Sequence, residues 1–145
     1  MSQVGGIIFV PENEYQLVDE KNLAAIKANV EVVKTVLAEN LEVRLDLDEQ
    51  SIEWLDGYVE RNREFWEPEV KQQHTSILGS FLGEAIVKNY GGQWAYSEGS
   101  LGIDFGNDTF AFPFNKVAKH IENGAEDSIF SFYKTTSMVA NGSIK

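Results

Sequence analysis

Three polar side chains, His74, Glu84 and Asp104, are the candidates for acid–base chemistry in this sequence. Such chemistry needs titratable groups close together in a pocket, where burial and neighbouring charges shift their pKa values. Glu84 falls on the narrow polar strip of an otherwise apolar helical pattern, and Asp104 alternates with Ile103 in a strand pattern. These residues define one hypothesis, a small-ligand-binding protein or enzyme with a pocket between that helix and the sheet. The alternative is that both carboxylates face water and that His74 is a hydrogen-bonded residue of the core boundary.

Metal and cofactor chemistry has little support in the residues. The chain has no cysteine, which excludes disulfides, thiolate metal sites and cysteine nucleophiles. Its two histidines, His74 and His120, belong to different helical patterns without further ligands at metal-binding spacing. No dinucleotide-binding loop, phosphate loop or nucleophile elbow is present. We therefore expect no cofactor and no metal, and a structural role for both histidines.

A stripe of Trp54, Tyr58, Arg61 and Phe65 is the main candidate for an interaction surface. These residues are spaced i, i+4, i+7 and i+11, which places them on one side of a helix. Tryptophan, tyrosine and arginine are the side chains that contribute most binding energy at protein interfaces. Aromatic stripes with helical spacing also form cores, so the stripe is either a partner-binding surface, a homodimer contact or a face covered by another part of the chain.

A second interaction candidate is a locally basic spot that combines Trp94 with Lys116 and Lys119. The rest of the chain is acidic: among 145 residues, 12 Lys and Arg stand against 23 Asp and Glu, a formal net charge of −11. Residues 1–72 hold 16 of the acidic and 7 of the basic side chains. Such a charge disfavours nucleic acid and anionic membranes and favours a basic protein partner, unless it only keeps helix surfaces solvated. With no basic leader and no long apolar run, we expect a cytoplasmic protein.

Apolar residues recur at three- and four-residue steps over 20–41, 48–66 and 69–90, which predicts three long helices. The third helix has the narrowest polar strip and should be the most buried. Each glycine inside a helix lowers stability by about 1 kcal/mol relative to alanine. Gly79 and Gly83, one turn apart in the third helix, therefore predict a packing groove approached by the backbone of another element.

After residue 92 the apolar period changes from 3.6 to 2, which predicts a three-stranded antiparallel meander over about 94–114, followed by two short helices. Helices first and strands afterwards favour an α+β fold, with an N-terminal helical layer packed on a small three-stranded antiparallel meander and short C-terminal helices. The length fits one domain, over 19–139, with a frayed tail over 140–145. The segment 1–18 is either an arm or, through the apolar run 7–10, an edge strand of the sheet.

Three short motifs resemble a small bacterial domain family of uncharacterised activity. The motifs are Leu78-Gly79-Ser80-Phe81-Leu82-Gly83-Glu84-Ala85-Ile86, then Tyr90-Gly91-Gly92-Gln93-Trp94, then Phe112-Pro113-Phe114-Asn115-Lys116-Val117. The resemblance covers about residues 50–135. It is similar in style to the acidic, cysteine-free domains encoded beside polymorphic toxins, some of which are immunity proteins. The resemblance implies no catalytic residue, because the motifs consist mostly of glycine, tryptophan and apolar positions.

The leading hypothesis is therefore a non-enzymatic bacterial interaction module, and an immunity-type inhibitor of a basic toxin is its most specific form. It depends on the acidic first half, the aromatic stripe with its arginine, and the absence of a recognisable catalytic set. The ligand-binding or enzymatic hypothesis is the alternative.

Overall fold

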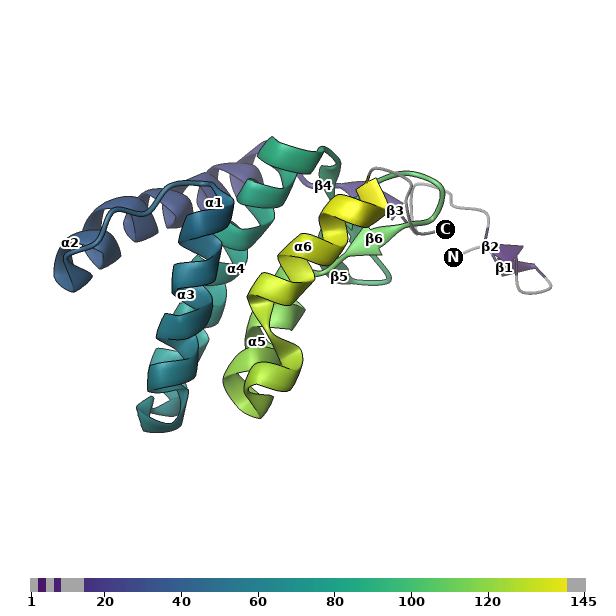
Figure 1. Cartoon of the computed structure of the whole chain (residues 1–145). Coiled ribbons are helices and arrows are strands. Elements are labelled where there is room, and N and C mark those ends of the chain that lie inside the picture. Colours follow the sequence, from purple (N-terminus) through teal and green to yellow (C-terminus); the bar gives the residue numbers. More distant parts are fainter. Residues whose placement is uncertain (1–2, 5–6, 9–14, 141–145) are drawn as a thin grey trace.

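The first long helix is interrupted by a wider turn. The computed structural model describes residues 3–4, 7–8 and 15–140, whose arrangement Figure 1 shows. The predicted helix over 20–41 is present as α1 (Glu20–Val32), a π-helical turn (Val33–Leu37) and α2 (Ala38–Leu41). The carboxylate of Asp19 caps α1 by accepting a hydrogen bond from the backbone N–H of Asn22 at 2.9 Å. The sequence pattern predicted the extent of this helix but not the π turn.

The second helix, α3 (Glu49–Asn62), continues into a 3-10 turn (Arg63–Phe65) and so confirms the helix predicted over 48–66. Asp48 is its N-cap, with a side-chain oxygen 2.8 Å from the backbone nitrogen of Ser51.

The third helix, α4 (Pro68–Tyr90), is the central element of the fold. It packs against α1, α5 (Pro113–Asn123) and α6 (Ile129–Ala140) (Figure 1). Its Phe81 and Leu82 are fully buried. The predicted groove at Gly79 and Gly83 exists, but it is filled by aromatic side chains and not by a neighbouring backbone. The ring of Phe114 occupies the space that a Cβ at Gly79 would need, and the indole of Trp94 does the same at Gly83.

A four-stranded antiparallel sheet lies beside the helices, in the order β3-β4-β5-β6. Its strands are β3 (Tyr15–Leu17), β4 (Gln93–Ser97), β5 (Ser100–Asp104) and β6 (Phe110–Ala111). Strands β4, β5 and β6 are the predicted meander, and β6 is shorter than expected because α5 already begins at Pro113. The α+β fold class is confirmed.

The segment 1–18, for which an arm or an edge strand was expected, contributes one edge strand to the sheet, but not from the described part of the apolar run 7–10. The strand that joins the sheet is β3, which pairs with β4 so that Gln16 lies opposite Tyr96. β2 (Ile7–Ile8) pairs instead with β1 (Gln3–Val4) in a separate two-stranded ladder. Residues 9–14 and most of the predicted tail, 141–145, lie outside the described residues. In the part of the chain that the structure describes, no helix combines the length and apolar character needed to cross a membrane.

Candidate functional site

The predicted stripe on α3 forms a stacked set of side chains. The rings of Trp54 and Tyr58 stack with centroids 5.8 Å apart and planes inclined by 14°. The guanidinium carbon of Arg61 lies 5.5 Å from the centre of the Trp54 ring, which is a cation–π contact. Phe65 follows in the 3-10 turn and is 81% exposed, whereas Tyr58 is buried and Trp54 is half-buried. The stripe is therefore part core and part surface, and its surface part is Trp54, Arg61 and Phe65.

Gly57 makes room for Arg61 on the helix surface. A Cβ built at Gly57 would lie 2.9 Å from Nη1 of Arg61, so the guanidinium passes over the glycine on its way to Trp54. Glycine in a helix interior is about 1 kcal/mol less stable than alanine, so this position lowers the stability of α3. Arg61 can lie flat against Trp54 because position 57 has no side chain.

A double-mutant cycle of Gly57 and Arg61 tests whether the glycine is needed for the contact between Arg61 and Trp54. Gly57→Ala should raise the free energy of unfolding by about 1 kcal/mol in an Arg61→Ala background, where nothing opposes the helix-propensity gain. In the wild-type background the gain should be smaller by about 0.5–1 kcal/mol, because the new methyl group displaces the cation from Trp54. Chemical denaturation of the four proteins measures both values, and equal gains would contradict the role given to Gly57.

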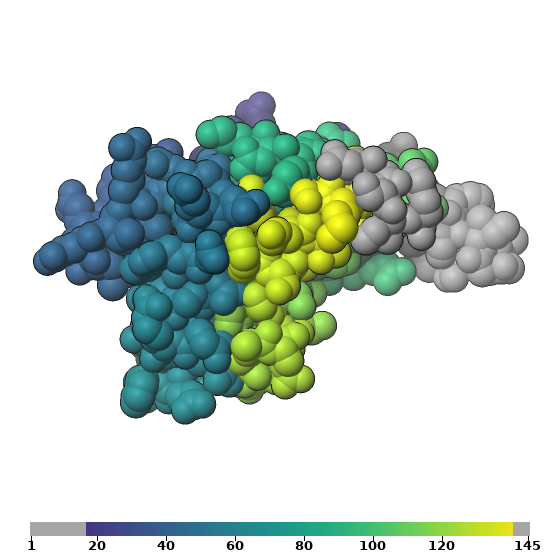
Figure 2. All heavy atoms as spheres, in the orientation of Figure 1, coloured from purple at the N-terminus to yellow at the C-terminus, as the bar shows by residue number. Residues whose placement is uncertain are grey.

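Acidic side chains run beside the stripe along the same exposed side of α3. Four exposed glutamates form this acidic strip: Glu49, Glu53, Glu60 and Glu64. Their helical spacing places the strip on the side of Gly57 that is away from Trp54. Residues 42–69 contain ten Asp and Glu against three Arg, whereas 20–41 contain three Glu and three Lys. The charge is thus concentrated on and around α3, and in Figure 2 this helix (blue-teal, lower left) lies at the surface.

Two of the three arginines in 42–69 already have partners within the chain. Arg63 donates from Nε to the carbonyl oxygen of Ile121 and from Nη2 to that of Glu122, both at 2.8 Å, and so caps the C-terminal end of α5. Arg44 forms an exposed pair with Asp46 at 2.9 Å. Arg61 is the cation that remains displayed on the outer face of α3, where it contacts Trp54.

His74, predicted as a residue of the alternative pocket, lies instead beneath the stripe. Its Nε2 is 2.7 Å from the hydroxyl of Tyr58, and its Nδ1 is 2.9 Å from the carbonyl oxygen of Val70. Because a carbonyl can only accept, Nδ1–H donates to Val70 and Nε2 accepts from Tyr58. The ring of Trp66 stacks on His74, with centroids 3.9 Å apart. Burial lowers the pKa of His74 and raises the pKa of Tyr58, so both side chains are kept neutral.

The lowered pKa of His74 predicts a pH dependence of stability. Since the folded-state pKa lies below the unfolded-state value of about 6.5, the unfolded chain takes up a proton first as the pH falls. The contribution of His74 is therefore complete above about pH 6.5 and is lost as the pH falls toward the folded-state pKa. Unfolding midpoints between about pH 7.5 and 5.5 should fall less steeply for His74→Gln than for the wild type. Parallel curves would contradict this prediction.

The three residues of the alternative pocket make their contacts in different places. Glu84 accepts a hydrogen bond from Nε1 of Trp94 at 2.9 Å. Oδ1 of Asp104 accepts from the backbone N–H of Gly106 at 2.8 Å, in the turn after β5. His74 is bound to Tyr58, as described above. The structure thus gives each residue its own partner, and the packing groove at Gly79 and Gly83 on α4 is filled by Phe114 and Trp94.

The second interaction candidate does not form a common surface. Trp94 is only 5% exposed, so its side chain is not available to a partner at the surface. Nζ of Lys116 pairs with Asp127 at 3.2 Å and lies 5.7 Å from the ring centre of Phe132. Hydrogen bonds from Asn123 and Lys116 lower the pKa of Asp127, which is consistent with this pairing. Lys119 is exposed on α5.

A buried histidine cluster was missed by the sequence analysis. His120 is fully buried, its Nε2 lies 2.9 Å from Oε1 of Glu60, and its Nδ1 lies 3.3 Å from the backbone nitrogen of Ile129. Since a backbone N–H can only donate, Nδ1 accepts and Nε2–H donates to Glu60. Next to it, Asp56 accepts hydrogen bonds from the Ser128 hydroxyl and from the backbone N–H of Phe130. The cluster joins α3, α5 and the start of α6.

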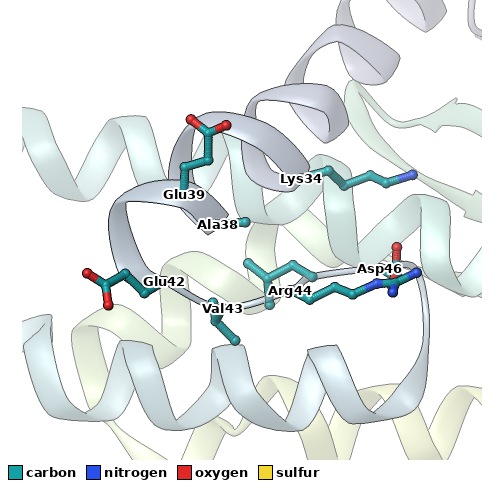
Figure 3. Close-up of a pocket in the computed structure, with 8 residues that line it drawn as sticks. Lys34, Ala38, Glu39, Glu42, Val43, Arg44 and Asp46 are labelled. Carbon is teal, nitrogen blue, oxygen red and sulfur yellow. The ribbon is translucent and has the colours of Figure 1, made fainter.

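The hollow between α2 and the following loop does not resemble a catalytic site (Figure 3). Its lining includes Ala38, Val43 and Leu45, while Glu39 and Glu42 point away from one another. A ligand site normally combines an apolar cleft with a few converging polar groups, and such convergence is lacking here. Among the described residues, no group of three or more histidine or acidic side chains is arranged to hold a metal ion.

The comparisons with known proteins add no function to this geometry. No family model matches the chain, and neither the curated proteins nor the solved structures include a significant match.

Proposed function

We propose that this protein is a non-enzymatic acidic interaction module of bacterial origin that binds a basic protein. The observation that carries the proposal is the concentration of charge: ten acidic residues and three arginines in 42–69, against an equal number of each sign in 20–41. A field of one sign over one part of a surface accelerates the encounter with a partner of the opposite sign. Two of the arginines are used within the fold, which leaves the acidic character largely intact.

An immunity-type inhibitor is the most specific form of this function. Inhibitors of basic toxins need fast association, which acidic side chains supply, and slow dissociation, which buried aromatic contacts supply. The similarity in style to acidic, cysteine-free domains encoded beside polymorphic toxins supports this form.

Affinity capture from the native host tests the proposal. The full-length chain should retain a basic protein at about 50 mM salt, and the amount retained should fall at about 500 mM, because salt screens surface charges. If the partner is a toxin, co-expression of this chain should also restore growth. A chain that retains no basic protein at either salt concentration would contradict the proposal.

A further inference from the structure

The outer face of α3, formed by Trp54, Gly57, Arg61 and Phe65 together with the acidic strip, differs from the other exposed helix surfaces of the described chain. Among the residues whose exposure the structure describes, Phe65 is the most exposed large apolar side chain, at 81%, and it follows a tryptophan and an arginine on the same side of the helix. Aromatic side chains and arginine dominate binding energy at protein interfaces. The face therefore has the composition of an interface centre.

This face also lowers the stability of the helix that carries it, in two independent ways. Gly57 occupies a helix interior, where glycine is unfavourable by about 1 kcal/mol relative to alanine. Glu49 with Glu53, and Glu60 with Glu64, are like charges four residues apart, which destabilise a helix by about 0.2–0.5 kcal/mol per pair. Local violations of helix rules are expected where a surface has a function.

The geometry points to the outer face of α3 as the docking surface for a basic protein, with Trp54 and Phe65 as aromatic contacts and the acidic strip as the counter-charge. This inference rests on the proposed function and assigns it to a surface. The partner would present arginine or lysine side chains to Glu53 and Glu64, because these carboxylates are exposed beside the aromatic residues. Glu64 also pairs with Nη1 of Arg63 at 3.3 Å, and its exposure leaves room for a second cation. A guanidinium group of the partner can contact both the acidic strip and the aromatic side chains, since it pairs with carboxylates and stacks on aromatic rings.

Arg61 places one positive charge at a fixed position on this otherwise acidic surface. Its position over Gly57 and against Trp54 holds the guanidinium at one place on the helix. A basic partner must therefore offer a carbonyl or carboxylate opposite Arg61, or the two like charges repel. Such a requirement sets the register of the complex and weakens the binding of partners that place only cationic groups opposite Arg61.

Titration with a nona-arginine peptide at about 20 mM salt, followed by NMR, tests the assignment with a defined probe. The largest shifts should occur at the Trp54 indole N–H and the backbone amides of 53–65. The double variant Glu53→Lys/Glu64→Lys should bind the peptide at least about tenfold more weakly. Its matched control is Glu31→Lys/Glu39→Lys, which changes the net charge equally on exposed positions of α1 and α2 and should change binding by less than about threefold.

The possible results distinguish an error in the assigned docking surface from an error in the proposed function. Equal weakening in both double variants, or shifts centred on 20–41, would overturn the assignment to α3 and leave the proposed function in place. Complete absence of binding at low salt would overturn the assignment together with its electrostatic basis. Capture of no basic protein from the host, with the peptide still bound at α3, would instead count against the proposed function alone.

Discussion

Trp94→Ala should lower the free energy of unfolding by about 3–5 kcal/mol and the melting temperature by about 10–20 °C. The indole fills the space beside Gly83, contacts the Phe114 ring in a tilted arrangement and donates a hydrogen bond to Glu84. Removing it leaves a cavity beside the most buried helix and takes the hydrogen-bond donor away from a half-buried carboxylate. Chemical denaturation and calorimetry measure the loss.

Two variants separate the causes of that loss. Phe65→Ala removes a similarly large ring from an 81% exposed position and should change stability by less than about 0.5 kcal/mol. Trp94→Phe refills part of the space beside Gly83 but cannot donate to Glu84, so it should fall between the wild type and Trp94→Ala. If Trp94→Ala were as stable as Phe65→Ala, the packing of α4 against the sheet and α5 described above would be wrong.

His120→Ala should lower the free energy of unfolding by about 2–4 kcal/mol. The imidazole is fully buried and connects Glu60 of α3 with the backbone N–H of Ile129 at the start of α6. Its removal leaves a cavity and a buried N–H without its acceptor, and the three helices lose a common hydrogen-bonded centre. Denaturation curves at pH 7.5 measure the effect.

The two control variants for this prediction lie on α5 and α3, the helices that carry His120 and Glu60. Lys119→Ala changes the exposed neighbour of His120 and should alter stability by less than about 0.5 kcal/mol. Glu60→Gln keeps an acceptor oxygen for Nε2–H and should lower stability by less than about 1 kcal/mol. A loss for Lys119→Ala as large as that for His120→Ala would show that α5 tolerates no substitution here, and the role given to the imidazole would fail.

Periodicity was sufficient to predict the helices and the meander. The apolar residues of α1, α3 and α4 follow the 3.6-residue period, and those of β4 and β5 follow the two-residue period, so each element is encoded locally. Glycines in α4 correctly predicted a groove. What fills the groove could not be predicted, because Phe114 and Trp94 belong to elements that reach α4 only through the tertiary fold.

The points that the sequence left open have the same physical origin. The apolar run 7–10 was one candidate for an edge strand, with an arm as the alternative, whereas the segment that pairs with β4 is Tyr15–Leu17. A structural role was expected for His120, but its partner could not be identified because Glu60 lies sixty residues earlier in the chain. The role of Gly57 was missed because a single glycine in a helix reveals nothing about an arginine that folds back over it.

The most direct test of the central claim, that the outer face of α3 binds the partner, is photo-crosslinking in the native host. A photoreactive amino acid in place of Phe65 is compared with one in place of Met138, which is 43% exposed on α6 and lies outside the docking surface. We predict a crosslink to a basic protein from position 65 and none from position 138. A partner crosslinked from position 138 and not from position 65 would contradict the account.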